Sequence, residues 1–150
     1  MDISLKNSIE QSVLCWLATA DDTGQPNVSP KEVFAAFDDQ FIIVANIASP
    51  NTEKNIRQNP RVCISFIDVF VQKGYQVKGE ATIVKPPSPE YPAMETILLR
   101  ITEGKFPFHS ITKITIESTK PILAPRYWLY PETTEEEQVE RAKRSFGVMD

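Results

Sequence analysis

Short apolar runs recur along most of the chain, separated by polar, turn-forming residues. Runs rich in Val, Ile and Phe and bounded by such residues are typical of β-strands. They predict six strands, at residues 14–20, 26–37, 41–45, 62–67, 75–85 and 109–123. The first connection reads DDTGQP and the second contains Asp38-Asp39, and both compositions favour tight turns. The pattern predicts a mainly β fold, a six-stranded antiparallel barrel with flanking helices.

Helical periodicity and capping residues occupy the remaining segments and predict helices over 4–13, 50–59, 93–103 and about 133–146. Ser49 suits a helix cap and Pro50 suits the first helical position. The chain leaves this short helix at Asn59-Pro60, because a residue before proline is pushed out of the helical region. Thr134 precedes Glu137 by three residues, which is a capping-box signature. No repeat or linker divides the chain, so residues 1–150 are expected to form a single domain with a helical tail.

Composition narrows the class of protein. The 150 residues carry a formal net charge of −4, with 41% hydrophobic and 24% charged residues. An acidic chain without a basic stripe is a poor nucleic-acid binder, so no nucleic-acid partner is expected. The first residues lack the pattern of a signal peptide, and no apolar run approaches the roughly 20 residues of a membrane span. We expect a cytoplasmic protein with no membrane partner, in which Cys15 and Cys63 are small hydrophobic residues of the strands.

Residues for familiar side-chain catalysis are scarce. The chain has one histidine, His109, and two cysteines in separate predicted strands, so no metal-ligand spacing exists. No G-x-S-x-G elbow, phosphate-binding Walker loop or dinucleotide fingerprint is found. His109 is interpreted as a residue at a strand start. No side chain is assigned a catalytic role, and no metal site is expected.

Three polar stretches stand out from this background. PNVSPK, residues 26–31, combines a proline inside a strand with Lys31, as an edge strand protected against pairing would. SPNTEKN, residues 49–55, places Ser, Asn and Thr donors at a helix start, where an anion such as a phosphate is favoured. VQKGYQVKG, residues 71–79, holds Gly79 inside a strand, which marks a bulge or a close approach to the backbone. Taken singly, each also fits a plain edge strand, a capped surface helix or a solvated hairpin.

The order of these stretches is more specific than any one of them. PNVSPK, FIIVAN, SPNTEKNIRQNPRVCISF and GYQVKGEA follow one another in a way that resembles the pyridoxamine 5′-phosphate oxidase-like family of FMN-binding split barrels. The resemblance is good over residues 12–84 and present only in outline elsewhere. It implies a six-stranded split barrel that forms a homodimer, with FMN held at the interface between the protomers.

The resemblance also implies which positions would hold the flavin. Ser29 to Glu32 would run along the ribityl chain and the ring, and Val44 to Asn46 would line the other side of the ring. Ser49, Asn51 and Thr52 match the phosphate segment, with Asn55 in the same polar group. Loop residues before strand five and an aromatic side chain near the C-terminal tail would come from the partner chain. The cofactor-binding residues expected are therefore Ser29, Pro30, Lys31, Glu32, Val44, Ala45, Asn46, Ser49, Asn51, Thr52, Asn55, Lys73, Gly74 and Trp128.

The sequence departs from the vitamin B6 oxidase at two places. Pro50-Asn51-Thr52 stands where the oxidase carries an Arg-Lys pair after its loop serine, and no Arg-x-His arrangement occurs near the C-terminus. We therefore expect an FMN-dependent oxidoreductase that acts on another small molecule, with an electron donor such as a nicotinamide. A deazaflavin or FAD in place of FMN is a less favoured alternative. The alternative function is a binding, storage or sensor protein for flavin or haem, without turnover.

Overall fold

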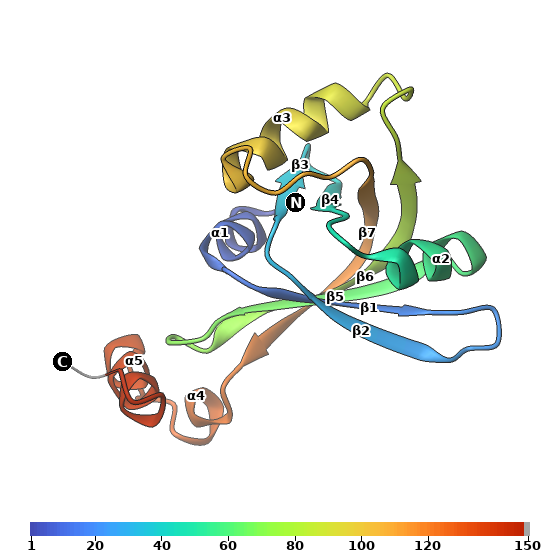
Figure 1. Cartoon of the computed structure of the whole chain (residues 1–150). Coiled ribbons are helices and arrows are strands. Elements are labelled where there is room, and N and C mark those ends of the chain that lie inside the picture. The colour runs from blue at the N-terminus through green and yellow to red at the C-terminus, as the bar shows by residue number, and fades with distance from the viewer. Residues whose placement is uncertain (149–150) are drawn as a thin grey trace.

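A single antiparallel sheet of seven strands curls into a half-open barrel, with helices on its outside (Figure 1). The computed structural model describes residues 1–148. The strands are β1 Cys15–Ala20, β2 Pro26–Lys31, β3 Phe34–Phe37, β4 Phe41–Ala45, β5 Arg61–Asp68, β6 Lys73–Val84 and β7 Ile111–Leu123. The helices are α1 Ile3–Gln11, α2 Pro50–Gln58, α3 Tyr91–Thr102, α4 Pro125–Leu129 and α5 Glu135–Ser145. The predicted split-barrel architecture is confirmed.

The strand count of six was wrong, because the predicted strand over 26–37 is interrupted at Glu32 and Val33. The strand order is β2-β1-β5-β6-β7-β4-β3, so β2 and β3 form opposite edges of the sheet although they are neighbours in the chain. Residues 32 and 33 connect these two edges, and the Ala45 N–H donates to the Val33 carbonyl at 3.0 Å, which continues the β3–β4 ladder into the break. Local hydrophobic pattern cannot reveal such a crossing, because both halves alternate like one strand.

The bulge predicted at Gly79 is present. The register of β6 against β7 shifts between Lys78 and Gly79. A Cβ atom at Gly79 would lie 1.9 Å from the Thr115 carbonyl oxygen, so only glycine allows this approach. Such a bulge bends its strand, which helps the long β6 curve around the barrel.

Two clusters of buried side chains stabilise the fold. One fills the barrel beneath α1 and α2 and includes Leu17, Ile42, Ile56, Ile64 and Phe66. The other lies under α3 and includes Ile43, Met94, Leu98 and Ile111. Alternating residues of β4 contribute to the two clusters, which is why FIIVA is apolar throughout.

The helices follow the sequence pattern with local differences. The first helix ends at Gln11 instead of extending to Val13, whose side chain is 80% exposed. The capping box at Thr134 is formed and begins α5 as predicted. The short α4 was not predicted, because five residues give too little periodicity. In Figure 1, α4 and α5 lie at one end of the sheet, apart from α2 and α3.

The two cysteines, which were expected to be small hydrophobic residues of the strands, lie in β1 and β5. Both cysteines are free; Cys15 is buried and Cys63 is half-buried. Burial raises the pKa of the Cys15 thiol to about 12, so this side chain is a neutral hydrophobic residue. Among residues 1–148, no helix has the length and apolar character that crossing a bilayer requires.

Candidate functional site

A hollow of about 290 Å³ lies at the seam of the barrel, between the end of β2 and the start of α2. We call it the first hollow. It is bordered by side chains from the PNVSPK strand and from the loop that begins α2. The lining residues are Asn27, Ser29, Pro30, Lys31, Ile47, Ala48, Ser49, Pro50, Asn51 and Thr52. Six of the residues predicted to bind the cofactor are therefore brought together in one place.

Lys31 is the cation of the first hollow and is only 9% exposed. Its ammonium group donates a hydrogen bond to the Ser49 hydroxyl, which ties β2 to the start of α2. Burial lowers the pKa of Lys31, while the nearby Cys15 and Glu53 act in the opposite direction. A partly desolvated ammonium gains most from an anionic ligand, because the low local dielectric strengthens the attraction.

The start of α2 adds backbone donors to this cation. Ser49 occupies the cap position, but its hydroxyl donates to the Ile47 carbonyl at 3.0 Å and does not cap the helix. Pro50 has no N–H, and no side chain among residues 1–148 accepts from the first turn. The N–H groups of Asn51 and Thr52 are therefore available to an anion, at the positive end of a nine-residue helix.

The loop into α2 is held in an unusual conformation. Ala48 has φ of +49°, in the left-handed region that favours glycine. This turn places the Ser49 hydroxyl beside Lys31 and opens the first turn of α2 toward β2. The donor set of the first hollow, one ammonium with backbone N–H and side-chain hydroxyl and amide groups, fits a phosphate group.

Other predicted residues lie outside the first hollow. Val44 is fully buried and Ala45 is 3% exposed, so their side chains belong to the core. Asn46 is buried among hydrogen-bond partners. Glu32 is exposed at the break between β2 and β3. The Asn55 amide donates to the Thr19 hydroxyl at 3.1 Å and fastens α2 to β1.

Lys73, Gly74 and Trp128 lie in a different region, near the end of the sheet that carries α4. Lys73 pairs with Glu135 at 2.8 Å, and Gly74 packs against the backbone of Phe66. Trp128 is 64% exposed. Lys73 and Gly74 line a hollow of about 380 Å³ that shares no residue with the first hollow. Within one chain these residues do not meet the group around Lys31.

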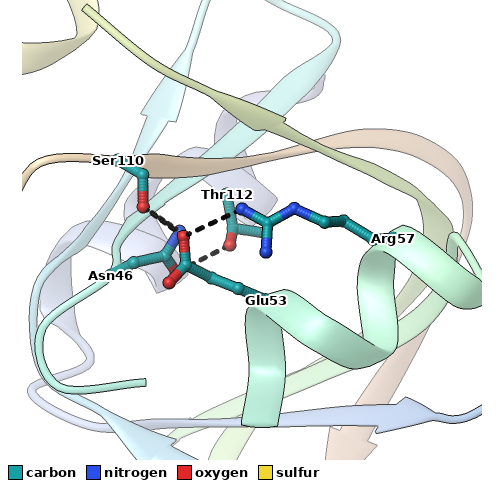
Figure 2. Close-up of polar contacts among 5 residues, drawn as sticks. All are labelled: Asn46, Glu53, Arg57, Ser110 and Thr112. Carbon is teal, nitrogen blue, oxygen red and sulfur yellow. Dashed lines mark hydrogen bonds and ion pairs between the residues drawn. The ribbon is translucent and has the colours of Figure 1, made fainter. Parts of the chain in front are cut away.

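A polar cluster that the sequence did not predict lies on the other side of the loop into α2 (Figure 2). The Thr112 hydroxyl donates to Asn46 Oδ1 at 2.8 Å, and Asn46 Nδ2 donates to the Ser110 hydroxyl at 3.1 Å. Ser110 in turn donates to Glu53 Oε1 at 2.5 Å. Arg57 follows Glu53 by one helical turn, with 3.8 Å between Arg57 Nη2 and Glu53 Oε1. The partners in the three hydrogen bonds are 57 to 66 residues apart in sequence, so no local signal could have found those contacts.

The cluster forms the floor of a hollow of about 500 Å³, which we call the second hollow. It is bounded by α2, the end of β6 and the loop before β7. The two hollows share Ala48, Ser49 and Pro50 and flank the beginning of the same helix. His109, interpreted from the sequence as a strand-start residue, lies in the loop before β7 and borders the second hollow.

A curled antiparallel half-open barrel with flanking helices defines the class of split-barrel proteins. The family model described as pyridoxamine 5′-phosphate oxidase matches residues 1–121, which is most of the chain. The chain therefore belongs to this family, and the resemblance of the PNVSPK and SPNTEKN stretches is confirmed.

Solved structures extend the likeness. HupZ from Group A Streptococcus is 27% identical, with a TM-score of 0.68 over 79% of this chain and 91% of that one. An FMN-binding protein from Syntrophomonas wolfei is 19% identical, with a TM-score of 0.67 over 84% and 91%. HutZ, the haem storage protein of Vibrio cholerae, is 20% identical, with a TM-score of 0.60 over 79% and 92%. The two likenesses below 25% identity show the fold alone. No curated protein matches the sequence.

Proposed function

We propose that this protein is a homodimeric, FMN-dependent oxidoreductase that acts on a small molecule. The observation that carries the proposal is the first hollow. A buried lysine, a helix start with open N–H groups and five polar side chains converge there without a carboxylate among the lining residues. This donor set suits the terminal phosphate of a flavin mononucleotide.

Bound FMN would supply the hydride and electron chemistry, so the chain itself needs few catalytic side chains. Lys31 and the first turn of α2 would hold the phosphate, and Ser29 and Pro30 lie along the wall that leads away from it. The hydrogen bond from Lys31 to the Ser49 hydroxyl positions the lysine before the ligand arrives. Such preorganisation lowers the entropic cost of binding.

The dimer is supported by an apolar face on the outside of β1 and β2. Trp16 is 48% and Val28 is 56% exposed, and Trp16 lies opposite Pro30 across the two strands. A second copy of the chain would cover these side chains and protect the β2 edge. It would also offer a position for Lys73, Gly74 and Trp128 at the flavin, which they cannot reach within their own chain.

A flavin- or haem-binding protein without turnover is the second candidate, supported by the shared fold of the haem storage protein HutZ. Haem iron is held by an axial ligand such as histidine. The only histidine of the chain, His109, borders the second hollow and is absent from the lining of the first. The donor set at the seam therefore favours a flavin phosphate over haem.

One purification distinguishes these functions. We expect a yellow protein whose cofactor is identified as FMN by mass, and whose visible absorption is bleached by NADH or NADPH without oxygen. A co-purified deazaflavin or FAD would change the cofactor, and haem would support the storage role. A yellow protein that no donor reduces would count against turnover.

The dimer is tested by light scattering during size-exclusion chromatography. Trp16→Glu places a charge on the proposed interface and is expected to give a monomer with weakened flavin binding. Ile101→Glu is the matched control, because Ile101 is 45% exposed on α3, away from β1 and β2. A Trp16→Glu protein with the mass of the wild-type dimer would contradict this interface.

A further inference from the structure

The second hollow carries charges that no part of the proposed flavin site uses. Its borders include Arg57, Lys85 and His109, against the single carboxylate of Glu53. The chain as a whole has a net charge of −4, whereas this hollow has more basic than acidic side chains. Clefts in which one sign of charge predominates attract ligands of the opposite sign.

The basic side chains keep hydrogen-bond donors open to a ligand. The Arg57 side chain is 53% exposed, and its 3.8 Å approach to Glu53 is too long for a hydrogen bond. Lys85 and His109 are exposed, and their side chains make no hydrogen bond or ion pair within residues 1–148. Arginine and lysine with open donors are the side chains that recognise carboxylate and phosphate groups.

The polar side chains on the floor of the second hollow already have hydrogen-bond partners. Asn46 and Ser110 are each 7% exposed and Thr112 is fully buried, and the three are joined in the chain of hydrogen bonds that ends on Glu53 (Figure 2). Glu53 Oε1 accepts from Ser110 and faces Arg57, so part of its charge is already compensated. The carboxylate therefore weakens an anion site here without closing it.

We propose that the second hollow binds a small organic anion through a carboxylate or phosphate group, with Arg57 and Lys85 as its cationic partners. Phe108 and Pro107 offer an apolar wall for the organic part of such a ligand. The site lies across the loop of residues 47–50 from the first hollow. Its ability to bind an anion does not depend on whether the first hollow binds FMN.

His109 provides the experiment with a specific reporter, because it is the only histidine in the chain. Its ring Cε1–H resonance is followed by proton NMR at fixed pH while sodium malonate or sodium phosphate is added to the full-length protein. Sodium chloride at equal ionic strength is the salt control. We expect a saturable shift with at least one of the two probes and none with chloride; a response to malonate alone or phosphate alone would identify the anionic group.

Variants of the lining residues test whether the anion binds in the second hollow. Arg57→Gln and Lys85→Gln are each expected to raise the Kd of the probe by about ten-fold, the size of a lost charge-assisted hydrogen bond. Arg100→Gln, an exposed arginine of α3, is the matched control and is expected to keep the wild-type Kd. Glu53→Gln can still accept from Ser110 but loses its charge, and should tighten binding, which a purely structural role would not do.

Lys31→Ala distinguishes binding in the first hollow from binding in the second. This variant is expected to leave the response of the His109 resonance to the anion unchanged. A shift lost in Lys31→Ala but kept in Arg57→Gln would place the anion in the first hollow and overturn the proposal. So would the absence of any saturable shift with both probes in wild-type protein that far-ultraviolet circular dichroism shows to be folded.

Discussion

The two hollows flank the start of the same helix, yet their charged side chains differ in burial and in whether a carboxylate lies among them. The first hollow has a buried ammonium, open backbone N–H groups and no carboxylate among its lining residues. The second has exposed cations above a carboxylate that already has partners. Glu53 belongs to the first turn of α2, where the helix dipole stabilises a negative charge and where a phosphate would compete for the same field.

The hydrogen bond from Ser110 draws the Glu53 carboxylate to one side of α2. The other side, which borders the first hollow, therefore has no carboxylate among its lining residues. The comparison teaches that a network formed by distant segments can determine which face of a helix start is available to a ligand. The variants below test this division.

The largest expected effect is on the floor of the second hollow. Asn46→Ala removes two hydrogen bonds together, the one that Asn46 accepts from Thr112 and the one that it donates to Ser110. Both hydroxyl groups stay buried and lose Asn46 as a partner. We expect the free energy of unfolding to fall by about 2 kcal/mol, measured by urea denaturation. Asn7→Ala on the exposed face of α1 is the matched control and should change stability by only a few tenths of a kcal/mol. Equal stabilities of the two variants would mean that the network does not brace α2.

Lys31→Ala is expected to raise the Kd of FMN by about ten-fold or more, because it removes the ammonium that would meet the phosphate. Flavin fluorescence titration measures the change. Lys54→Ala, an exposed lysine of α2 that lines neither hollow, is expected to keep the wild-type value. An unchanged Kd in Lys31→Ala would refute the placement of the phosphate.

The pH dependence of FMN binding also tests whether the Lys31 ammonium holds the phosphate. Burial lowers the pKa of Lys31 below its usual value of 10.5, so raising the pH removes its charge earlier than for an exposed lysine. Affinity for the phosphate is expected to fall as the pH rises through that lowered pKa. Cys15 adds no charge in this range, because burial raises its pKa to about 12. Lys31→Arg stays charged and should bind FMN with little change over the same pH interval.

Thr52→Ala is expected to weaken FMN binding by only a few-fold, about the effect of one neutral hydrogen bond. Thr52 is 1% exposed, so the loss of its methyl group also affects packing. Thr52→Ser keeps the hydroxyl and separates the two effects: it should restore FMN affinity while leaving the packing loss. Titration of both variants, together with their unfolding midpoints, is the measurement.

The smallest effect is expected in the loop that both hollows share. Ala48→Gly relieves the left-handed backbone and should raise the free energy of unfolding by about 0.5–1 kcal/mol. Ala93→Gly in α3 is the control of opposite sign, because glycine destabilises a helix. Thermal unfolding of the two variants measures both. A loss of stability in Ala48→Gly would show that its positive φ carries no strain.

Features encoded over a few neighbouring residues could be predicted from the sequence. The alternation of apolar residues gave most strands, Pro50 gave the start of α2, and Thr134 gave the cap of α5, because each acts on its own backbone. Gly79 marked its bulge for the same reason. The first hollow was largely predictable, since Ser49, Asn51 and Thr52 are contiguous and Lys31 ends a distinctive strand.

Tertiary structure alone decided what depends on distant partners. The break at Glu32 separates β2 and β3 onto opposite edges, and only the closed curl of the sheet makes it visible. Val44 became fully buried because β7 and the barrel interior cover it. Asn46, Ser110 and Glu53 meet across more than fifty residues of intervening chain. Their hydrogen bonds form only when separate elements pack, so the candidates for the first hollow could be read from the sequence, whereas packing created the second hollow.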